Sequence, residues 1–83
     1  MRPCRVDGRV TDADGRLLTH VRVLFDGALL DNGGGRFTAW FQHTRTYIFT
    51  VVDGRTDRIL LTSRAVLEAG TPCEVELRLG DHR

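Results

Sequence analysis

The stretch 31–52, DNGGGRFTAWFQHTRTYIFTVV, decides the fold of this chain. It opens with five turn-forming residues and then alternates apolar and polar side chains in two successive stripes. An alternation of period two is typical of a β-strand with one buried face. We therefore predict two strands and a tight reversal, with the apolar residues at the centre of a β core. These residues are Phe37, Ala39 and Phe41 on the first stripe and Tyr47, Phe49 and Val51 on the second.

Shorter stretches with the same alternation flank this segment on both sides. Turn signals separate them, and Asp26-Gly27 is a strong two-residue hairpin signal. Residues 64–69 are compatible with a single helical turn, and nothing there continues a helical period. The pattern predicts an all-β fold: a seven-stranded antiparallel Greek-key β-sandwich that forms one domain over residues 1–83, with a polar tail at 79–83. The strands outside the opening stretch are predicted at 4–11, 21–25, 28–30, 58–63 and 73–79.

The charge pattern gives no indication of a polyanionic partner. Twelve basic and eleven acidic residues give a net charge of +1, and both signs are spread along the chain. We therefore predict no binding to nucleic acid and none to a membrane surface. All twelve basic residues are arginine, which we interpret as the bias of a GC-rich bacterial genome. The alternative interpretation is a set of bidentate contacts to carboxylate or phosphate groups.

The amino terminus lacks the apolar run of a signal peptide, so the sequence as given predicts a soluble, cytoplasmic chain. A fragment of a longer protein would look the same. The two cysteines, Cys4 and Cys73, match no zinc or thioredoxin motif. Each falls on the inward stripe of its predicted strand, and two interpretations stay open. They are either a pair of small buried thiols or a disulfide that joins the first and last strands.

Five short motifs follow one another over roughly the first 55 residues: Val6-Asp7-Gly8-Arg9-Val10-Thr11-Asp12-Ala13-Asp14-Gly15, Leu17-Leu18, Val21-Arg22-Val23, Gly35-Arg36-Phe37 and Tyr47-Ile48-Phe49-Thr50-Val51. Together they resemble the carboxypeptidase regulatory-like domain, whose pattern is a G-x-V-x-D-x-x-G-x-P-L-x-x-V-x-V opening, a D-x-x-G-x-F turn and a Y-x-L-x-V strand. The resemblance implies a transthyretin-like (prealbumin-like) sandwich of seven strands in two sheets, which commonly serves as a non-catalytic module. It also implies that the first strand lies beside a late one in the same sheet. This arrangement would bring Cys4 and Cys73 within reach of each other.

The transthyretin-like fold has a catalytic branch, the 5-hydroxyisourate hydrolases. Those enzymes carry a histidine in the first strand, an arginine and a second histidine further on, and a carboxy-terminal Tyr-Arg-Gly-Ser. Here residues 4–11 contain no histidine, and the chain ends Gly80-Asp81-His82-Arg83. We therefore predict that the protein is not an enzyme, and we keep a hydrolase of this type as a remote alternative.

Other candidate sites have simple structural interpretations. Asp12-Ala13-Asp14-Gly15 begins like a calcium loop but lacks the later ligands, so it predicts a plain turn. The histidines, His20, His43 and His82, have no partner at metal-ligand spacing. No serine or cysteine lies in a recognisable nucleophile motif. We predict no catalytic residue, no metal ligand and no cofactor.

Trp40 is the clearest functional signal in the sequence. If its neighbours on the first stripe face the core, Trp40 faces outward, and the same alternation turns Ile48 and Val52 outward on the next strand. Outward aromatic and branched residues are typical of protein interfaces. We therefore predict a non-catalytic protein-binding or assembly module that docks onto a protein partner or self-associates as a homo-oligomer. Trp40, Ile48 and Val52 are its candidate partner-binding residues.

A carbohydrate-binding module is the alternative. In that case Trp40 and Tyr47 would be the stacking surfaces for sugar rings, since aromatic faces are large and apolar. The flanking polar residues would be Asp31, Asn32 and Gln42.

Overall fold

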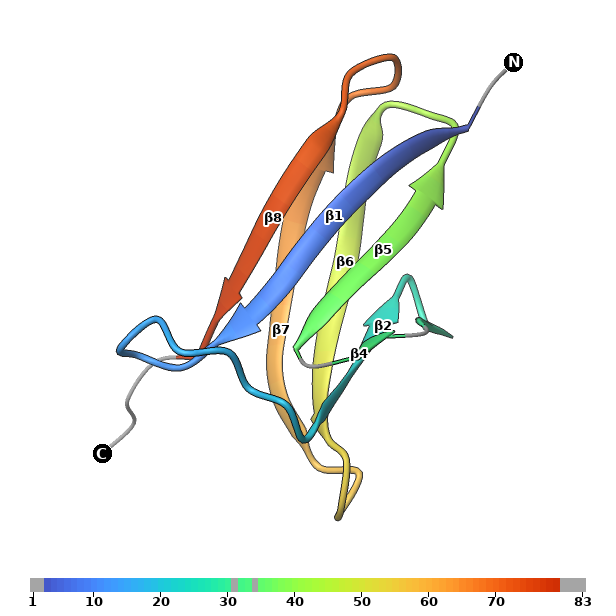
Figure 1. Cartoon of the computed structure of the whole chain (residues 1–83). Coiled ribbons are helices and arrows are strands. Elements are labelled where there is room, and N and C mark those ends of the chain that lie inside the picture. The colour runs from blue at the N-terminus through green and yellow to red at the C-terminus, as the bar shows by residue number, and fades with distance from the viewer. Residues whose placement is uncertain (1–2, 31, 34, 80–83) are drawn as a thin grey trace.

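The computed structural model describes residues 3–30, 32–33 and 35–79. These residues form eight β-strands in two four-stranded sheets that pack face to face (Figure 1). Sheet A has the order β4-β5-β1-β8, and its strands are β4 (Asn32–Gly33), β5 (Arg36–Phe41), β1 (Cys4–Thr11) and β8 (Cys73–Arg78). Sheet B has the order β3-β2-β6-β7, and its strands are β3 (Ala28–Leu29), β2 (Val21–Phe25), β6 (Arg45–Asp53) and β7 (Ile59–Leu67).

The predicted all-β architecture in two sheets is confirmed. Throughout the described part of the chain no residue is helical, so no helix there could span a bilayer. All strand pairs are antiparallel except β1 and β8, which pair in parallel with Val6 opposite Cys73 and Gly8 opposite Val75. The sequence prediction of an antiparallel sandwich therefore fails for this one pair, which joins the two ends of the fold.

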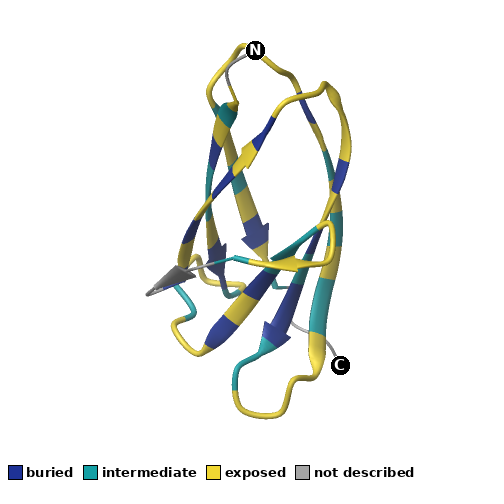
Figure 2. Ribbon diagram, turned by 90° about the vertical axis from the view of Figure 1, so that its right-hand side faces the viewer, coloured by how far each residue is buried: buried dark blue, intermediate teal, exposed yellow. Residues whose placement is uncertain are grey.

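The two strands of the opening stretch lie in different sheets and face each other across the core. β5 pairs with β1, whereas β6 pairs with β2 and β7, and the short connection 42–44 crosses between the sheets. Ring centroids of Phe37 and Phe49 are 5.6 Å apart, and those of Phe41 and Tyr47 are 5.5 Å apart. Each strand buries one face only, so the two stripes bury each other. All six predicted core residues are buried, as the alternating colours of Figure 2 show along the strands.

The glycine-rich segment is more than the turn that its composition predicts. Asn32 and Gly33 form β4, which pairs with the start of β5 through Asn32 opposite Phe37 and Gly33 opposite Arg36. Gly35 forms the turn with a positive φ of 82°, a conformation that favours glycine. Asp31 and Gly34 of the predicted turn lie outside the described residues. The added strand makes eight strands where the sequence predicted seven.

The helical turn predicted at 64–69 is wrong. β7 continues through this region to Leu67, where Ala65 lies opposite Tyr47 and Leu67 opposite Arg45. The long strand β6 provides partners for eight of the nine residues of β7, and this pairing outweighs a weak local helical preference. A register shift at Val51/Val52 makes Leu60 an extra residue. That bulge explains why three consecutive apolar residues at 59–61 have no clear alternation.

Asp26 fastens the β2–β3 turn to β6. The predicted Asp26-Gly27 hairpin is confirmed, with positive φ values of 50° and 88° at the two turn residues. The Ile48 N–H donates to Asp26 Oδ1 at 2.8 Å, and Arg45 pairs with Asp26 Oδ2. The hydrogen bond from Ile48 lowers the pKa of the Asp26 carboxyl, Arg45 lowers it further, and desolvation opposes both.

Replacing Asp26 should give a pH-dependent loss of stability. Because the folded-state pKa is lowered, the stabilisation is present above the unfolded-state pKa and is lost as the pH falls through the folded-state pKa. We expect Asp26→Asn to reduce the free energy of unfolding by about 1 kcal/mol near neutral pH, since asparagine accepts a hydrogen bond and tolerates positive φ but carries no charge. Urea unfolding at a series of pH values measures this, and the difference from wild type should shrink in acid.

Asp57→Asn is the matched control. Asp57 also has a positive φ, 58°, and pairs with Arg22, but its side chain is 76% exposed. Its replacement should change stability by less than about 0.5 kcal/mol. A difference between Asp26→Asn and wild type that stays constant with pH would contradict the role of the Asp26 charge.

Candidate functional site

Exposed apolar residues lie on both outer faces of the sandwich. Trp40 is 59% exposed on sheet A and stands opposite Arg5, while Ile48 is 40% exposed on sheet B and stands opposite Arg64. The predicted exposure of both residues is confirmed. Because they belong to opposite faces, a single flat partner surface cannot cover both, and they mark two separate surfaces.

Val52 is not exposed as predicted. Its exposed fraction is 8%, although it does not belong to the core cluster between the sheets. Arg22 lies opposite Val52 in the β2–β6 pair, and its guanidinium donates to Asp57 Oδ1 at 3.2 Å and to the Gly54 carbonyl at 3.3 Å. The arginine side chain therefore extends over Val52 toward the loop that follows β6. We remove Val52 from the candidate partner-binding residues.

Tyr47 cannot serve as a stacking surface for a ligand, because it is buried. It is 4% exposed, its ring stacks on Phe25 with centroids 5.0 Å apart, and the Arg45 guanidinium carbon lies 4.0 Å from its centroid. Its hydroxyl donates to the His43 carbonyl at 2.6 Å. Of the two aromatic residues considered for sugar binding, Trp40 alone is accessible.

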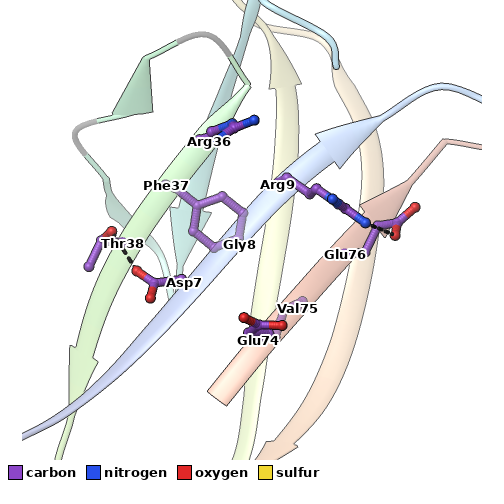
Figure 3. Close-up of a pocket in the computed structure, with 9 residues that line it drawn as sticks. All are labelled: Asp7, Gly8, Arg9, Arg36, Phe37, Thr38, Glu74, Val75 and Glu76. Carbon is purple, nitrogen blue, oxygen red and sulfur yellow. Dashed lines mark hydrogen bonds and ion pairs between the residues drawn. The ribbon is translucent and has the colours of Figure 1, made fainter. Parts of the chain in front are cut away.

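A shallow hollow of about 650 Å³ lies on the outer face of sheet A, across β5, β1 and β8 (Figure 3). Its floor is formed at Gly8. Two contacts order its walls: Thr38 Oγ1 donates to Asp7 Oδ1 at 2.9 Å, and Arg9 Nη2 lies 3.0 Å from Glu76 Oε1. The polar residues that line it are Asp7, Arg9, Arg36, Thr38, Glu74 and Glu76.

Glu76 contacts three side chains at the end of the hollow that is nearest the carboxy-terminal end of β8. Its Oε1 accepts from Arg9, and its Oε2 accepts from Thr11 Oγ1 at 3.0 Å and lies 3.2 Å from Arg78 Nη2. The hydrogen bond from Arg9, followed by that from Thr11, lowers the pKa of the Glu76 carboxyl. Glu76 is therefore a charged structural residue whose oxygens are occupied by its own chain.

Arg36 and Glu74 are the two charged residues of the hollow whose side chains have no hydrogen bond or ion pair to the part of the chain that the structure describes. One lies on β5 and the other on β8, with β1 between them. An open surface with one charge of each sign that is unpaired among the described residues is suited to binding polar groups.

The remaining sequence candidates do not come together. Asp12 Oδ1 accepts from the Asp14 and Arg16 N–H groups at 2.9 and 3.0 Å, which confirms the plain turn. Among the described residues no three histidine, cysteine or acidic side chains gather as a metal site. His20 and His43 are exposed, and His82 lies outside the described residues.

Cys4 and Cys73 are free thiols, both half-buried. β1 and β8 are neighbours as the family resemblance implied, but Cys73 stands opposite Val6, two residues beyond Cys4. Each sulfur contacts the β7–β8 connection instead: the Gly70 N–H donates to Cys4 Sγ at 2.8 Å, and Cys73 Sγ donates to the Thr71 carbonyl at 3.3 Å.

Sequence reasoning missed the apolar residues at the edges of sheet B. Leu29 is 62% exposed on β3, and Ile59 and Val66 are 64% and 68% exposed on β7. The exposure of Val66 was missed because residues 64–69 were predicted to form a helical turn. The exposure of Ile59 was missed because the bulge interrupts the alternation at 59–61. Continuing the strand prediction through 64–67 would have placed Val66 on the solvent side, two positions from Arg64.

Comparison with protein-family models gives no match, and comparison with curated protein sequences gives no significant match. The function is therefore inferred from the residues and surfaces described above.

Proposed function

We propose that this chain is a non-catalytic protein-binding or assembly module that docks onto a protein partner or onto further copies of itself. The observation that carries the proposal is the amount of apolar surface left in solvent. Five large apolar side chains are between 40% and 68% exposed although the core between the sheets is well formed. Exposed apolar residues that gather on one surface are typical of interfaces. Three of the five, Ile48, Ile59 and Val66, lie on the neighbouring strands β6 and β7.

We also propose that the sandwich is of the Greek-key, transthyretin-like type found in carboxypeptidase regulatory-like domains. Support comes from the parallel pairing of the first strand with the last and from the division of four of the five motifs between the two sheets, Leu17-Leu18 lying in the connection between β1 and β2. Such a fold is compatible with many functions, so this proposal does not itself identify a partner.

Carbohydrate binding is the second candidate function. It is supported by the position of Trp40 two residues from Thr38, on the same strand and the same face as the polar hollow. An exposed indole beside carboxylates and an unpaired arginine is compatible with a sugar ring stacked on the indole and hydrogen-bonded at its rim. Because Tyr47 is buried, this alternative rests on a single aromatic platform.

Trp40→Ala and Ile48→Ser test the two faces separately. We expect the wild type to self-associate in light scattering or to bind a purified partner, and one of the two variants to weaken that association about tenfold or more, as for an interface anchor. Gln42→Ala is the control, because Gln42 is also exposed and close to Trp40 in sequence.

Two results would decide against protein binding. A wild type that stays monomeric at high concentration and binds no protein would contradict the proposal. A change in Trp40 fluorescence on titration with glycans, in the absence of any protein association, would favour the carbohydrate alternative.

A further inference from the structure

The two edge strands of sheet B differ in how well they are protected against pairing with a strand of another molecule. Sheet B ends on one side in the two-residue strand β3 and on the other in the nine-residue strand β7. Natural edge strands are usually short, interrupted by proline or rich in charge. β7, ILLTSRAVL, contains no proline and one charged residue, Arg64. It is the longest strand edge left open among the described residues.

The inner face of β7 is also incompletely covered. Leu61, Ser63 and Ala65 point toward the core but are only half-buried, whereas their partners Val51 and Phe49 on β6 are fully buried. On the facing sheet, Cys73 and Val75 of β8 are half-buried in the same way. The apolar interior is therefore incompletely covered along the side of the sandwich where β7 and β8 are the edge strands. Side chains of another molecule bound there would cover apolar surface.

The hydrogen bonds of the Ile48 backbone show which N–H and carbonyl groups of β7 face the open edge. Its N–H donates to Asp26 Oδ1 and its carbonyl accepts from the Asp26 N–H at 2.8 Å, so both groups point away from β7. In an antiparallel pair, the residue opposite such a position also points its backbone groups away. Arg64 is opposite Ile48. The N–H and carbonyl groups of Arg64, and of Thr62 and Val66 two residues to either side, therefore face the open edge.

These free groups restrict how β7 could pair with a second β7. Residues that exchange hydrogen bonds must come from the set Thr62, Arg64 and Val66 in both copies. A register centred on Arg64 places two guanidinium groups directly opposite each other, which is unfavourable. A register centred on Ser63, the midpoint of β7, places Thr62 opposite Arg64 of the other copy and pairs residues 61–65 of both copies.

The register centred on Ser63 is also complementary on both faces. On the inner face Ser63 meets Ser63 on the two-fold axis, and the large Leu61 meets the small Ala65. On the outer face Thr62 meets Arg64, which places a small polar side chain opposite a charged one. The two antiparallel registers that overlap most of the shorter strand β8 are less favourable, because they place Glu76 opposite Glu76 or Glu74 opposite Glu76.

We propose that two copies of this chain dimerise by antiparallel pairing of β7 with β7 about a two-fold axis at Ser63, so that their B sheets form one continuous sheet. The proposal rests on the proposed assembly function and specifies its partner as a second copy. An isologous contact of this kind uses the same surface on both subunits and closes at the dimer.

Opposite charges at position 62 provide the test, because Thr62 is exposed and stands opposite Arg64 of the other copy. We expect Thr62→Arg to raise the dimer dissociation constant about tenfold, since it creates two like-charge pairs, and Thr62→Glu to lower it. Thr62→Arg combined with Arg64→Glu should restore dimerisation to near the wild-type level. Sedimentation equilibrium measures all four proteins, with thermal unfolding to show that each is folded.

A cysteine on the two-fold axis tests the register independently. Residues opposite each other without mutual hydrogen bonds have Cα atoms about 4.5 Å apart, within the range of a disulfide. Under mild oxidation Ser63→Cys should give a disulfide-linked dimer. Leu61→Cys should not, because Leu61 of one copy faces Ala65 of the other. The wild type, which retains Cys4 and Cys73, is the background control.

The possible outcomes separate this proposal from the proposed function. A wild type that is monomeric at all concentrations but binds another protein overturns dimerisation through β7 and leaves the binding function intact. A monomer that binds nothing overturns both. A dimer with the same dissociation constant in Thr62→Arg and Thr62→Glu overturns the β7 register and leaves self-association through another surface.

Discussion

Phe49→Ala should cost about 3 to 5 kcal/mol of folding free energy, because it removes the largest fully buried side chain of the core. Phe49 is 0% exposed and lies between Phe25 and Phe37, with ring centroids 5.1 and 5.6 Å away. The two sheets are held apart by these rings, so the cavity left by the substitution cannot close without moving a sheet. A domain of this size has a total stability of roughly 4 to 12 kcal/mol. The variant should therefore lose a large part of the stability of the domain, and it should be mostly unfolded if the wild type lies at the low end of this range.

Chemical unfolding followed by far-UV circular dichroism measures this loss. Phe49→Leu retains most of the volume and should cost about 1.5 kcal/mol or less. Trp40→Ala removes a larger side chain from the surface and should change stability by about 0.5 kcal/mol or less. A Phe49→Ala loss no greater than that of Trp40→Ala would contradict the central position of Phe49.

The alternation of apolar residues was sufficient to predict the core and the all-β fold. Every apolar residue on the two stripes of the opening segment is buried, because a strand with one apolar face has one stable way to orient. The turn chemistry of Asp26-Gly27 was equally reliable, since both residues adopt positive φ. These features depend on local sequence, and local sequence was enough to predict them.

The features that failed depend on distant partners. β7 extends to Leu67 because eight residues of β6 pair with it, and nothing within 64–67 reveals the length of β6. Val52 has the alternation of an exposed residue, yet Arg22 covers it from a strand thirty residues earlier. The position of β1 beside a late strand came from the family resemblance and not from periodicity, and the parallel direction of the β1–β8 pair was not predicted. The candidate interface was missed for the same reason, since the open edge of β7 exists only once the strand order is known.

Gly8→Ala should destabilise the fold by about 2 kcal/mol, although it adds a single methyl group. Gly8 is opposite Phe37 on β5, and its missing side chain points inward, where a Cβ would lie 2.1 Å from Phe37 Cζ and 2.5 Å from Cε1. The Phe37 ring is 3% exposed and packs against Phe49, so it cannot turn into solvent without opening the core. The glycine is thus needed because an aromatic ring occupies the space of its side chain, and not because of its backbone conformation.

A double-mutant cycle identifies this cause. If the Phe37 ring is what excludes a side chain at position 8, Gly8→Ala should cost much less in a Phe37→Leu background, where the shorter side chain leaves room for the methyl group. The coupling energy should be about 1 kcal/mol or more, as for residues in direct contact. Equal costs of Gly8→Ala in both backgrounds would place the effect in the β1 backbone instead. Gly8 would then be required by the backbone conformation of β1. The floor of the hollow on sheet A would be set by that backbone and not by the ring of Phe37.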